Sequence, residues 1–127
     1  MLIGAGRGAA FGDIDNDGDI DVIVSNAGQH AYILRNDGGN RNNWLGIETI
    51  GKKSNRDGIG SRVKVVSASG LVQYFAINTA VGYLSASDKR LVVGLGDDSV
   101  AKLSGSCTFA VRIWTSAGMK TATRILK

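Results

Sequence analysis

The chain carries the stretch Phe11-Gly-Asp-Ile-Asp-Asn-Asp-Gly-Asp-Ile-Asp21, in which five aspartates alternate with other residues and no lysine or arginine intervenes. Carboxylates held this close repel one another unless a cation lies between them. Ca²⁺ suits such a cluster because it takes about six to eight oxygen ligands. The stretch therefore predicts a calcium-binding loop, whose metal residues would be Asp13, Asp15, Asp17, Asp19 and Asp21.

The spacing also indicates which kind of calcium loop this is. With Asp13 as position one, Gly18 stands at position six, where a sharp turn is needed, and Val24 stands at position twelve, where an EF-hand has glutamate. Residues 20–25 are rich in β-branched side chains, which are typical of a strand. We expect a loop on a β-hairpin, with side-chain oxygens from four aspartates and the backbone carbonyl from Asp19, whose side chain would face solvent. A hydrated Asp/Asn/Gly turn is the alternative, although it needs no regular spacing.

Turns in this chain must be built from glycine, asparagine and aspartate, because it has eighteen glycines and no proline. Between these turns lie short segments that alternate or are rich in β-branched and aromatic residues. They are Asp19–Ser25, His30–Arg35, Asn43–Ile50, Ser61–Ser67, Leu71–Ile77, Arg90–Gly94, Thr108–Trp114 and Lys120–Leu126. A helical turn is expected only near 97–103. The pattern predicts an all-β fold of short antiparallel strands.

We place a boundary near residue 42, where an aspartate-rich part gives way to a part rich in lysine, arginine and valine. Residues 1–42 would form a hairpin unit, and residues 43–127 a small β-sandwich or barrel-like domain. The two parts could share one core. Four aromatic residues could stack on sugars but are expected to fill that core instead. They are Trp44, Tyr74, Tyr83 and Trp114.

Composition limits the classes of function. Fifteen basic residues against eleven acidic ones give a net charge of +4, but the basic residues are dispersed, which disfavours a nucleic-acid partner and leaves weak attraction to acidic polysaccharide open. No apolar run approaches the roughly 20 residues that span a bilayer, so membrane insertion is not expected. The first seven residues do not resemble a signal peptide. The lone Cys107 excludes an internal disulfide and is expected to pack as a small apolar residue.

Catalysis is not expected. His30 is the only histidine, Glu48 is the only glutamate, and no Gly-x-Ser-x-Gly elbow occurs. The alternative is a metal-dependent hydrolase that uses the aspartate loop on a glycan or phosphate substrate. Two further residues leave alternatives open. Arg7 could brace the loop by pairing with an aspartate or could be exposed, and Arg56 could sit in a structural turn or contact a carboxylate or sulfate of a partner.

The first part resembles the FG-GAP or VCBS repeat through residues 6–26 and Leu34-Arg-Asn-Asp37. That family implies one blade of a propeller whose loop holds calcium through Asp13, Asp15, Asp17, Asp19 and Asp21. The second part resembles the ASPIC/UnbV domain. The motifs behind this resemblance are Asn43-Trp-Leu-Gly-Ile47, Lys53-Ser-Asn-Arg-Asp-Gly-Ile-Gly60, Gly82-Tyr-Leu-Ser85, Arg90-Leu91, Gly94-Leu-Gly96 and Val111-Arg-Ile-Trp114.

Both families occur in bacterial proteins, and the resemblance implies an extracellular or periplasmic module for recognition, adhesion or scaffolding, with a protein or carbohydrate ligand. A propeller typically needs four to eight blades, whereas this chain has one. The chain could be a fragment of a longer protein, the blade could pack on the second part, or several chains could assemble by strand exchange or as a homodimer. We favour packing of the blade on the second part.

Overall fold

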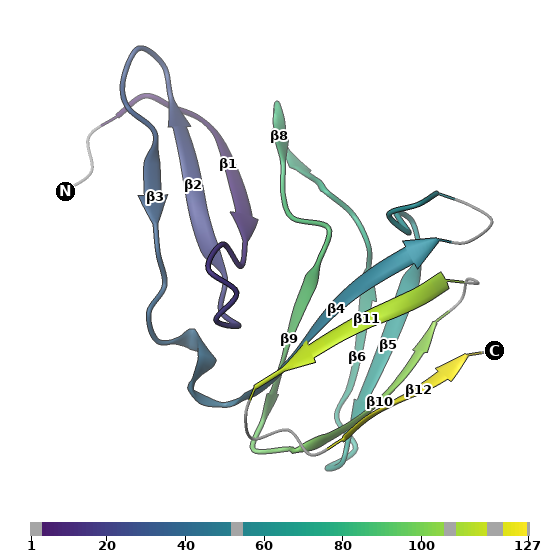
Figure 1. Cartoon of the computed structure of the whole chain (residues 1–127). Helices are drawn as coiled ribbons and strands as arrows, with labels where there is room; N and C mark the ends of the chain where they lie inside the picture. Colours follow the sequence, from purple (N-terminus) through teal and green to yellow (C-terminus); the bar gives the residue numbers. More distant parts are fainter. Residues whose placement is uncertain (1–3, 52–54, 106–108, 117–120, 127) are drawn as a thin grey trace.

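The computed structural model describes residues 4–51, 55–105, 109–116 and 121–126, so Cys107 lies outside the described residues (Figure 1). Within these ranges the chain forms strands and one 3-10 turn, η1 (Gly39–Arg41), without an α-helix, which confirms the predicted all-β class. The strands are β1 (Gly6–Gly12), β2 (Asp21–Asn26), β3 (Tyr32–Leu34), β4 (Asn43–Gly51), β5 (Arg62–Ser67), β6 (Val72–Ala76), β7 (Ala80–Gly82), β8 (Ser85–Ala86), β9 (Leu91–Gly96), β10 (Val100–Gly105), β11 (Phe109–Thr115) and β12 (Thr121–Leu126).

The first part of the chain is a three-stranded antiparallel sheet in the order β1-β2-β3. Strands β1 and β2 pair down to Gly12 and Asp21, so the intervening aspartate loop closes at the end of this hairpin. The sequence pattern did not predict β1, because its run of glycine and alanine has low intrinsic preference for strands. Its pairing with the β-branched strand β2 decides its conformation instead.

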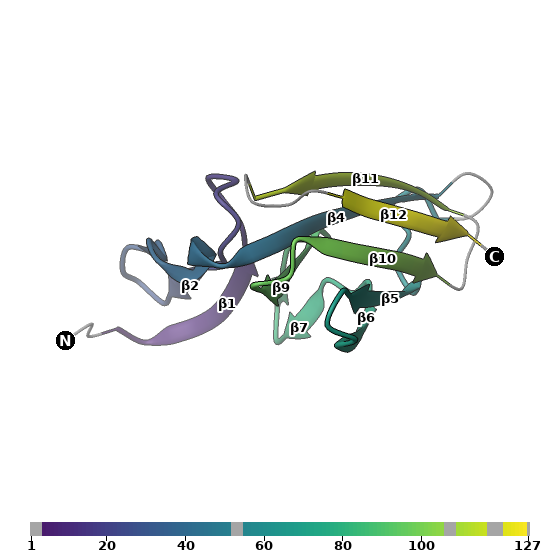
Figure 2. The ribbon, with the colours of Figure 1, turned by 90° about the horizontal axis from the view of Figure 1, so that it is seen from below.

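The second part is a sandwich of two sheets, with strand orders β12-β10-β5-β6 and β11-β4-β9. Figure 2 shows β4 and β11 on one side of this sandwich and β5 and β6 on the other. All pairings within it are antiparallel except the parallel pair β10 and β12. Of the two predicted forms, the sandwich is present, and the sheets of the described residues do not close into a barrel.

Alternate residues of the facing strands form the core, as expected for strands with one buried face. Its buried members are Leu45, Ile47, Val63, Val65, Ile77, Val93, Leu95, Ala101 and Leu103. The last two lie on β10, where the sequence suggested a helical turn near 97–103. That expectation was wrong because Ala101 and Leu103 alternate into the core from a strand that pairs with β5.

The aromatic residues divide between interior and surface. Trp44 is buried, in agreement with the prediction, and Trp114 is half-buried. Tyr74 and Tyr83 are 72% and 80% exposed, so the expectation that they fill the core was wrong. Tyr74 instead lies on β6 with its ring centroid 5.6 Å from the Lys64 ammonium, in a cation–π contact.

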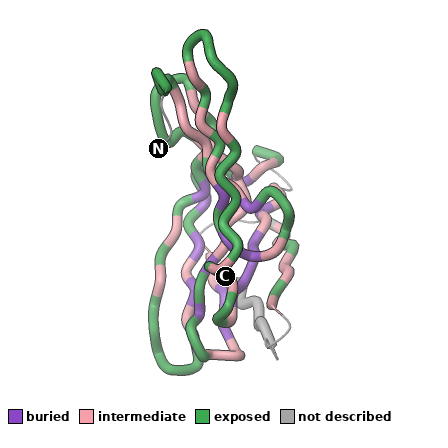
Figure 3. Tube along the Cα trace, turned by 90° about the vertical axis from the view of Figure 1, so that its left-hand side faces the viewer, coloured by how far each residue is buried: buried purple, intermediate pink, exposed green. Residues whose placement is uncertain are grey.

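The first part packs on the second along the edge strand β1. The Asp88 N–H donates to the Phe11 carbonyl (2.9 Å), and the Phe11 N–H donates to the Ser87 hydroxyl (3.0 Å). The hairpin of β7 and β8 lies beside β1, where Gly8 approaches Ser85 closely. Figure 3 shows that most buried residues lie in the sandwich, whereas the first sheet is largely exposed or half-buried. No helix in the described ranges is long and apolar enough to cross a membrane.

Candidate metal centre

Three carboxylates of the aspartate loop converge on one point. Asp13, Asp15 and Asp21 each offer an oxygen, and these oxygens all lie within 4.8 Å of one another. Asp13 and Asp21 are 2% and 1% exposed, whereas Asp15 is exposed. Hard carboxylate oxygens at this separation are the donors that a divalent cation such as Ca²⁺ or Mg²⁺ takes. The cluster could therefore hold a metal ion.

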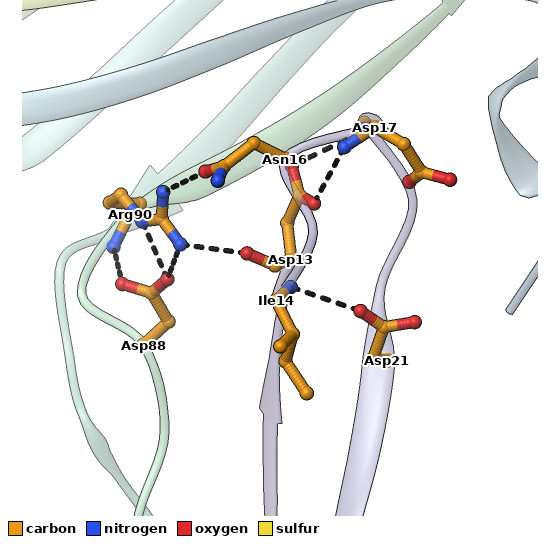
Figure 4. A network of polar contacts seen from close by, with 8 residues as sticks. Asp13, Ile14, Asn16, Asp17, Asp21, Asp88 and Arg90 are labelled. Atoms are coloured by element: carbon orange, nitrogen blue, oxygen red, sulfur yellow. Dashed lines mark hydrogen bonds and ion pairs between the residues drawn. The ribbon is translucent and has the colours of Figure 1, made fainter. Parts of the chain in front are cut away.

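The loop backbone wraps around the Asp13 carboxylate. The N–H groups of Asp17 and Gly18 donate to its two oxygens at 3.0 and 3.2 Å, and Figure 4 shows the first of these contacts. The wrapping needs two left-handed residues, Asn16 with φ 60° and Gly18 with φ 96°. Asparagine and glycine are the residues that reach this region at low cost, which explains the Asn and Gly of the sequence motif.

Burial and hydrogen bonding shift the pKa values of the two buried carboxylates in opposite directions. Burial raises the pKa of Asp13, although the Gly18 and Asp17 N–H groups act to lower it. For Asp21, the N–H groups of Asn36 and Ile14, each at 2.9 Å, lower the pKa. A cation at the cluster would favour the ionised form of Asp13, which burial alone disfavours.

Asp17 and Asp19 lie in the same loop but outside this group of three. The Asp17 carboxylate accepts a hydrogen bond from the Asp19 N–H at 3.1 Å. Asp19 is only 3% exposed, so the expectation that its side chain faces solvent was wrong. Its Oδ2 atom accepts from the Gly39 N–H at 2.9 Å because the turn at η1 folds over it. Metal ligation by Asp17 and Asp19 stays a prediction.

The second oxygen of Asp19 bears on whether the loop fits a cation. Asp19 Oδ1 is buried and, among the described residues, has no hydrogen-bond partner. A buried carboxylate oxygen without a partner is costly, since it has lost its hydration and gained nothing. A cation in the loop would reduce this cost through its charge, so the orphaned oxygen and the three converging carboxylates both fit a bound metal.

The loop is also tied to the segment that enters the sandwich. Three contacts reach residues 36–40: Asn36 N–H to Asp21 (2.9 Å), Gly39 N–H to Asp19 (2.9 Å) and the Asn40 side-chain amide to the Asp17 carbonyl (3.0 Å). The segment leads directly into β4. The conformation of the aspartate loop and the path of the chain into the sandwich are therefore coupled.

Gly18 places the loop against the sandwich itself. A Cβ atom at this position would overlap the indole ring of Trp44, which extends from β4 and is only 8% exposed. Gly18 therefore serves two needs at once, the left-handed backbone and the close approach to a flat ring. The sequence motif accounts for the first need, whereas the second arises only in the folded chain.

Arg90 joins the loop to the second part from the other side. Its guanidinium donates to the Asp13 carbonyl (2.8 Å), to the Asn16 side chain (2.6 Å) and to Asp88 (2.6 Å), as Figure 4 shows. The hydrogen bond with Asp88 holds the pKa of Arg90 above its ordinary value. The group also lies over the Trp114 ring, 5.6 Å from its centroid. Three acceptors and a ring face suit the planar fork of arginine.

The sequence pattern did not single out this role for Arg90. It left open whether Arg7 braces the loop or is exposed, and Arg7 is exposed on β1. Arg90 stands 77 residues from Asp13, and no local spacing connects them. The one available signal was the Arg90-Leu91 pair within the ASPIC/UnbV resemblance, which carried no role for the side chain.

Changing Arg90 to lysine should destabilise the protein by about 1–3 kcal/mol, because one ammonium cannot serve three acceptors in different directions. Urea unfolding of the chelator-treated protein measures the change. Arg112→Lys is a matched control, since the Arg112 side chain is 70% exposed and is paired with Glu48. Equal effects of the two substitutions would contradict a bracing role for Arg90.

Comparison with known proteins gives two results. A search of curated proteins finds no match to this chain. A family model does match the part of the chain that contains β5 to β9 and most of β10, including Arg90 and the hairpin beside β1. The matching model is that of the ASPIC and UnbV family, and the match covers residues 51–104.

Proposed function

We propose that the chain is a non-enzymatic calcium-binding β-module that serves recognition, adhesion or scaffolding outside the cytoplasm. In this proposal the first part acts as a single FG-GAP/VCBS-type unit attached to the ASPIC/UnbV domain. The observation that carries it is the convergence of Asp13, Asp15 and Asp21 in a loop that is packed on the sandwich. The domain match supports an extracellular type of module.

Calcium would be held by Asp13, Asp15 and Asp21, with Asp17 and Asp19 as further oxygen donors of the same loop. The ion supplies positive charge that offsets the mutual repulsion of these carboxylates. The residues themselves supply the connections: Asp19 and Asp21 accept hydrogen bonds from residues 36–40, and Arg90 donates to the loop backbone. Binding would thus stabilise the junction between the two parts.

A structural role for the metal is favoured over a hydrolytic one by how the carboxylates are used. Both oxygens of Asp13 and both oxygens of Asp21 accept backbone N–H groups. A catalytic metal needs an open coordination position together with a base placed for a substrate. Carboxylates whose oxygens already accept N–H groups of the loop are better suited to holding a structural metal than to taking part in hydrolysis.

Calorimetric titration of chelator-stripped protein with CaCl₂ tests this function. We expect one saturable site with a dissociation constant on the order of 10⁻⁴–10⁻³ M, the range common in extracellular modules. MgCl₂ should bind more weakly, because Mg²⁺ demands regular octahedral geometry and gives up water reluctantly. An absence of saturable heat with calcium up to about 10 mM, beyond that range, would refute the proposal.

A further inference from the structure

A second polar site lies away from the aspartate loop, at the end of β4. It is a pocket of about 210 Å³ lined by Glu48, Thr49, Ile50, Arg56, Asp57, Lys89 and Arg112. The lining comes from β4, β11, the loop after β4 and the segment before β9. Ile50 is the only apolar side chain among these residues, so the wall consists mainly of charged and hydrogen-bonding groups.

Three cations and two carboxylates surround this pocket. Arg112 pairs with Glu48 across the β4–β11 ladder at 3.1 Å, and Lys89 pairs with Asp57 at 2.5 Å. Arg56 is exposed, and within the described ranges its side chain has no ion-pair partner. The pocket therefore keeps one uncompensated positive charge, which favours an anionic guest.

Residues 55–58, which carry Arg56, are held in place before any ligand arrives. The Gly51 N–H donates to the Arg56 carbonyl (2.9 Å), and the Thr49 hydroxyl donates to the Asp57 carbonyl (3.0 Å). The Asp57 N–H donates to the Asn55 side chain (2.9 Å), and Gly58 packs tightly against Thr49. A segment fixed in this way loses little conformational entropy when it binds a ligand.

We propose that this pocket binds one carboxylate or sulfate group of an acidic saccharide, with Arg56, Lys89 and Arg112 as the cationic contacts. Its volume is below the roughly 300–1,000 Å³ of pockets that enclose a drug-sized ligand, so it takes one group of a longer molecule. Arginine presents a planar fork that matches the oxygens of such an anion. Glu48 and Asp57 stand beside the cations and accept hydrogen bonds from hydroxyl groups. A sugar acid offers hydroxyls next to its anion, whereas an acidic peptide side chain does not.

The inference goes beyond the proposed calcium role and shares no residue with the aspartate loop. It is tested by NMR titration of the ¹⁵N-labelled full chain, in calcium and again in chelator, with sodium glucuronate, glucose 6-sulfate and glucose. We expect the anionic sugars to shift the amide signals of residues 48–50, 56–57, 89 and 112, with a dissociation constant of about 1–10 mM for ligands this small. Binding of glucuronate alone or of the sulfate alone identifies the anion. Glucose should cause no such shifts.

Substitutions distinguish binding in this pocket from a general electrostatic attraction of anions to a basic protein. Arg56→Gln and Arg112→Gln should each weaken binding about tenfold, the cost of one hydrogen bond to a charged group. Arg62→Gln removes the same charge from an exposed site on β5, outside the pocket, and should change the affinity less than about twofold. The proposal is overturned if neither anion shifts these signals at about 20 mM, well above the expected constant. Equal shifts with glucose, or an equal loss in Arg62→Gln, would also overturn it.

Discussion

Changing Asp13 or Asp21 to asparagine is expected to weaken calcium binding by about 100-fold or more, because each change removes a carboxylate from a site whose affinity depends on its count of charged ligands. Both residues are almost fully buried, so solvent does little to compensate for the loss of the negative charge. The amide oxygen of asparagine can still accept one backbone N–H, which preserves part of the loop structure. Calorimetric titration gives the affinity, and circular dichroism shows whether the fold remains.

Asp97→Asn is the matched control for these variants. Asp97 is exposed in the turn between β9 and β10, outside the aspartate loop. Its replacement by asparagine removes the same negative charge as the loop substitutions do. It should leave the calcium affinity within about twofold of the wild type. If Asp97→Asn weakened binding as much as Asp13→Asn, calcium would be responding to net charge and the aspartate cluster would not be its site.

Gly18→Ala is expected to destabilise the protein by about 2–5 kcal/mol. Roughly 1–2 kcal/mol comes from placing a side chain on left-handed backbone, and about 1–3 kcal/mol comes from overpacking against Trp44. Calcium affinity should fall as well, since the displaced loop no longer wraps around Asp13. Urea unfolding in chelator measures the change in stability, and Trp44 fluorescence reports the movement of the loop.

Gly70→Ala separates the two contributions. Gly70 has φ 90°, close to the 96° of Gly18, but a Cβ atom there would meet nothing within 4 Å. It should therefore carry only the backbone cost of about 1–2 kcal/mol. Equal losses of stability in the two variants would mean that the contact between the loop and Trp44 contributes nothing.

The sequence predicts the strands of the sandwich well wherever one face is buried. Val63 and Val65 alternate with the more exposed Arg62 and Lys64, and this period of two is visible without any structure. It predicts β10 poorly, since Ala101 and Leu103 are too few to distinguish a strand from a turn. Pairing with β5 and β12 decides that segment, and such long-range partners are not encoded locally.

In the candidate metal centre, too, some features follow from the local sequence and others depend on distant parts of the chain. The alternating aspartates predict the loop and its turn at Gly18, because both follow from local spacing. The burial of Asp19 depends on η1, twenty residues away, and the contacts of Arg90 depend on the packing of β9 beside β4. Tyr74 lies on β6 and Tyr83 in the turn between β7 and β8, and residue type alone does not say whether such a position is covered.

Calcium is expected to bind at the aspartate loop and to stabilise the whole fold. Thermal unfolding in about 10 mM CaCl₂ and in excess chelator tests both at once. With a dissociation constant of about 10⁻⁴–10⁻³ M, binding adds roughly 1.4–2.7 kcal/mol and should raise the melting temperature by about 5–10 °C in one cooperative transition. The Asp13→Asn and Asp21→Asn variants should show no such rise. An unchanged melting temperature of the wild-type protein in calcium would contradict stabilisation by calcium at this loop.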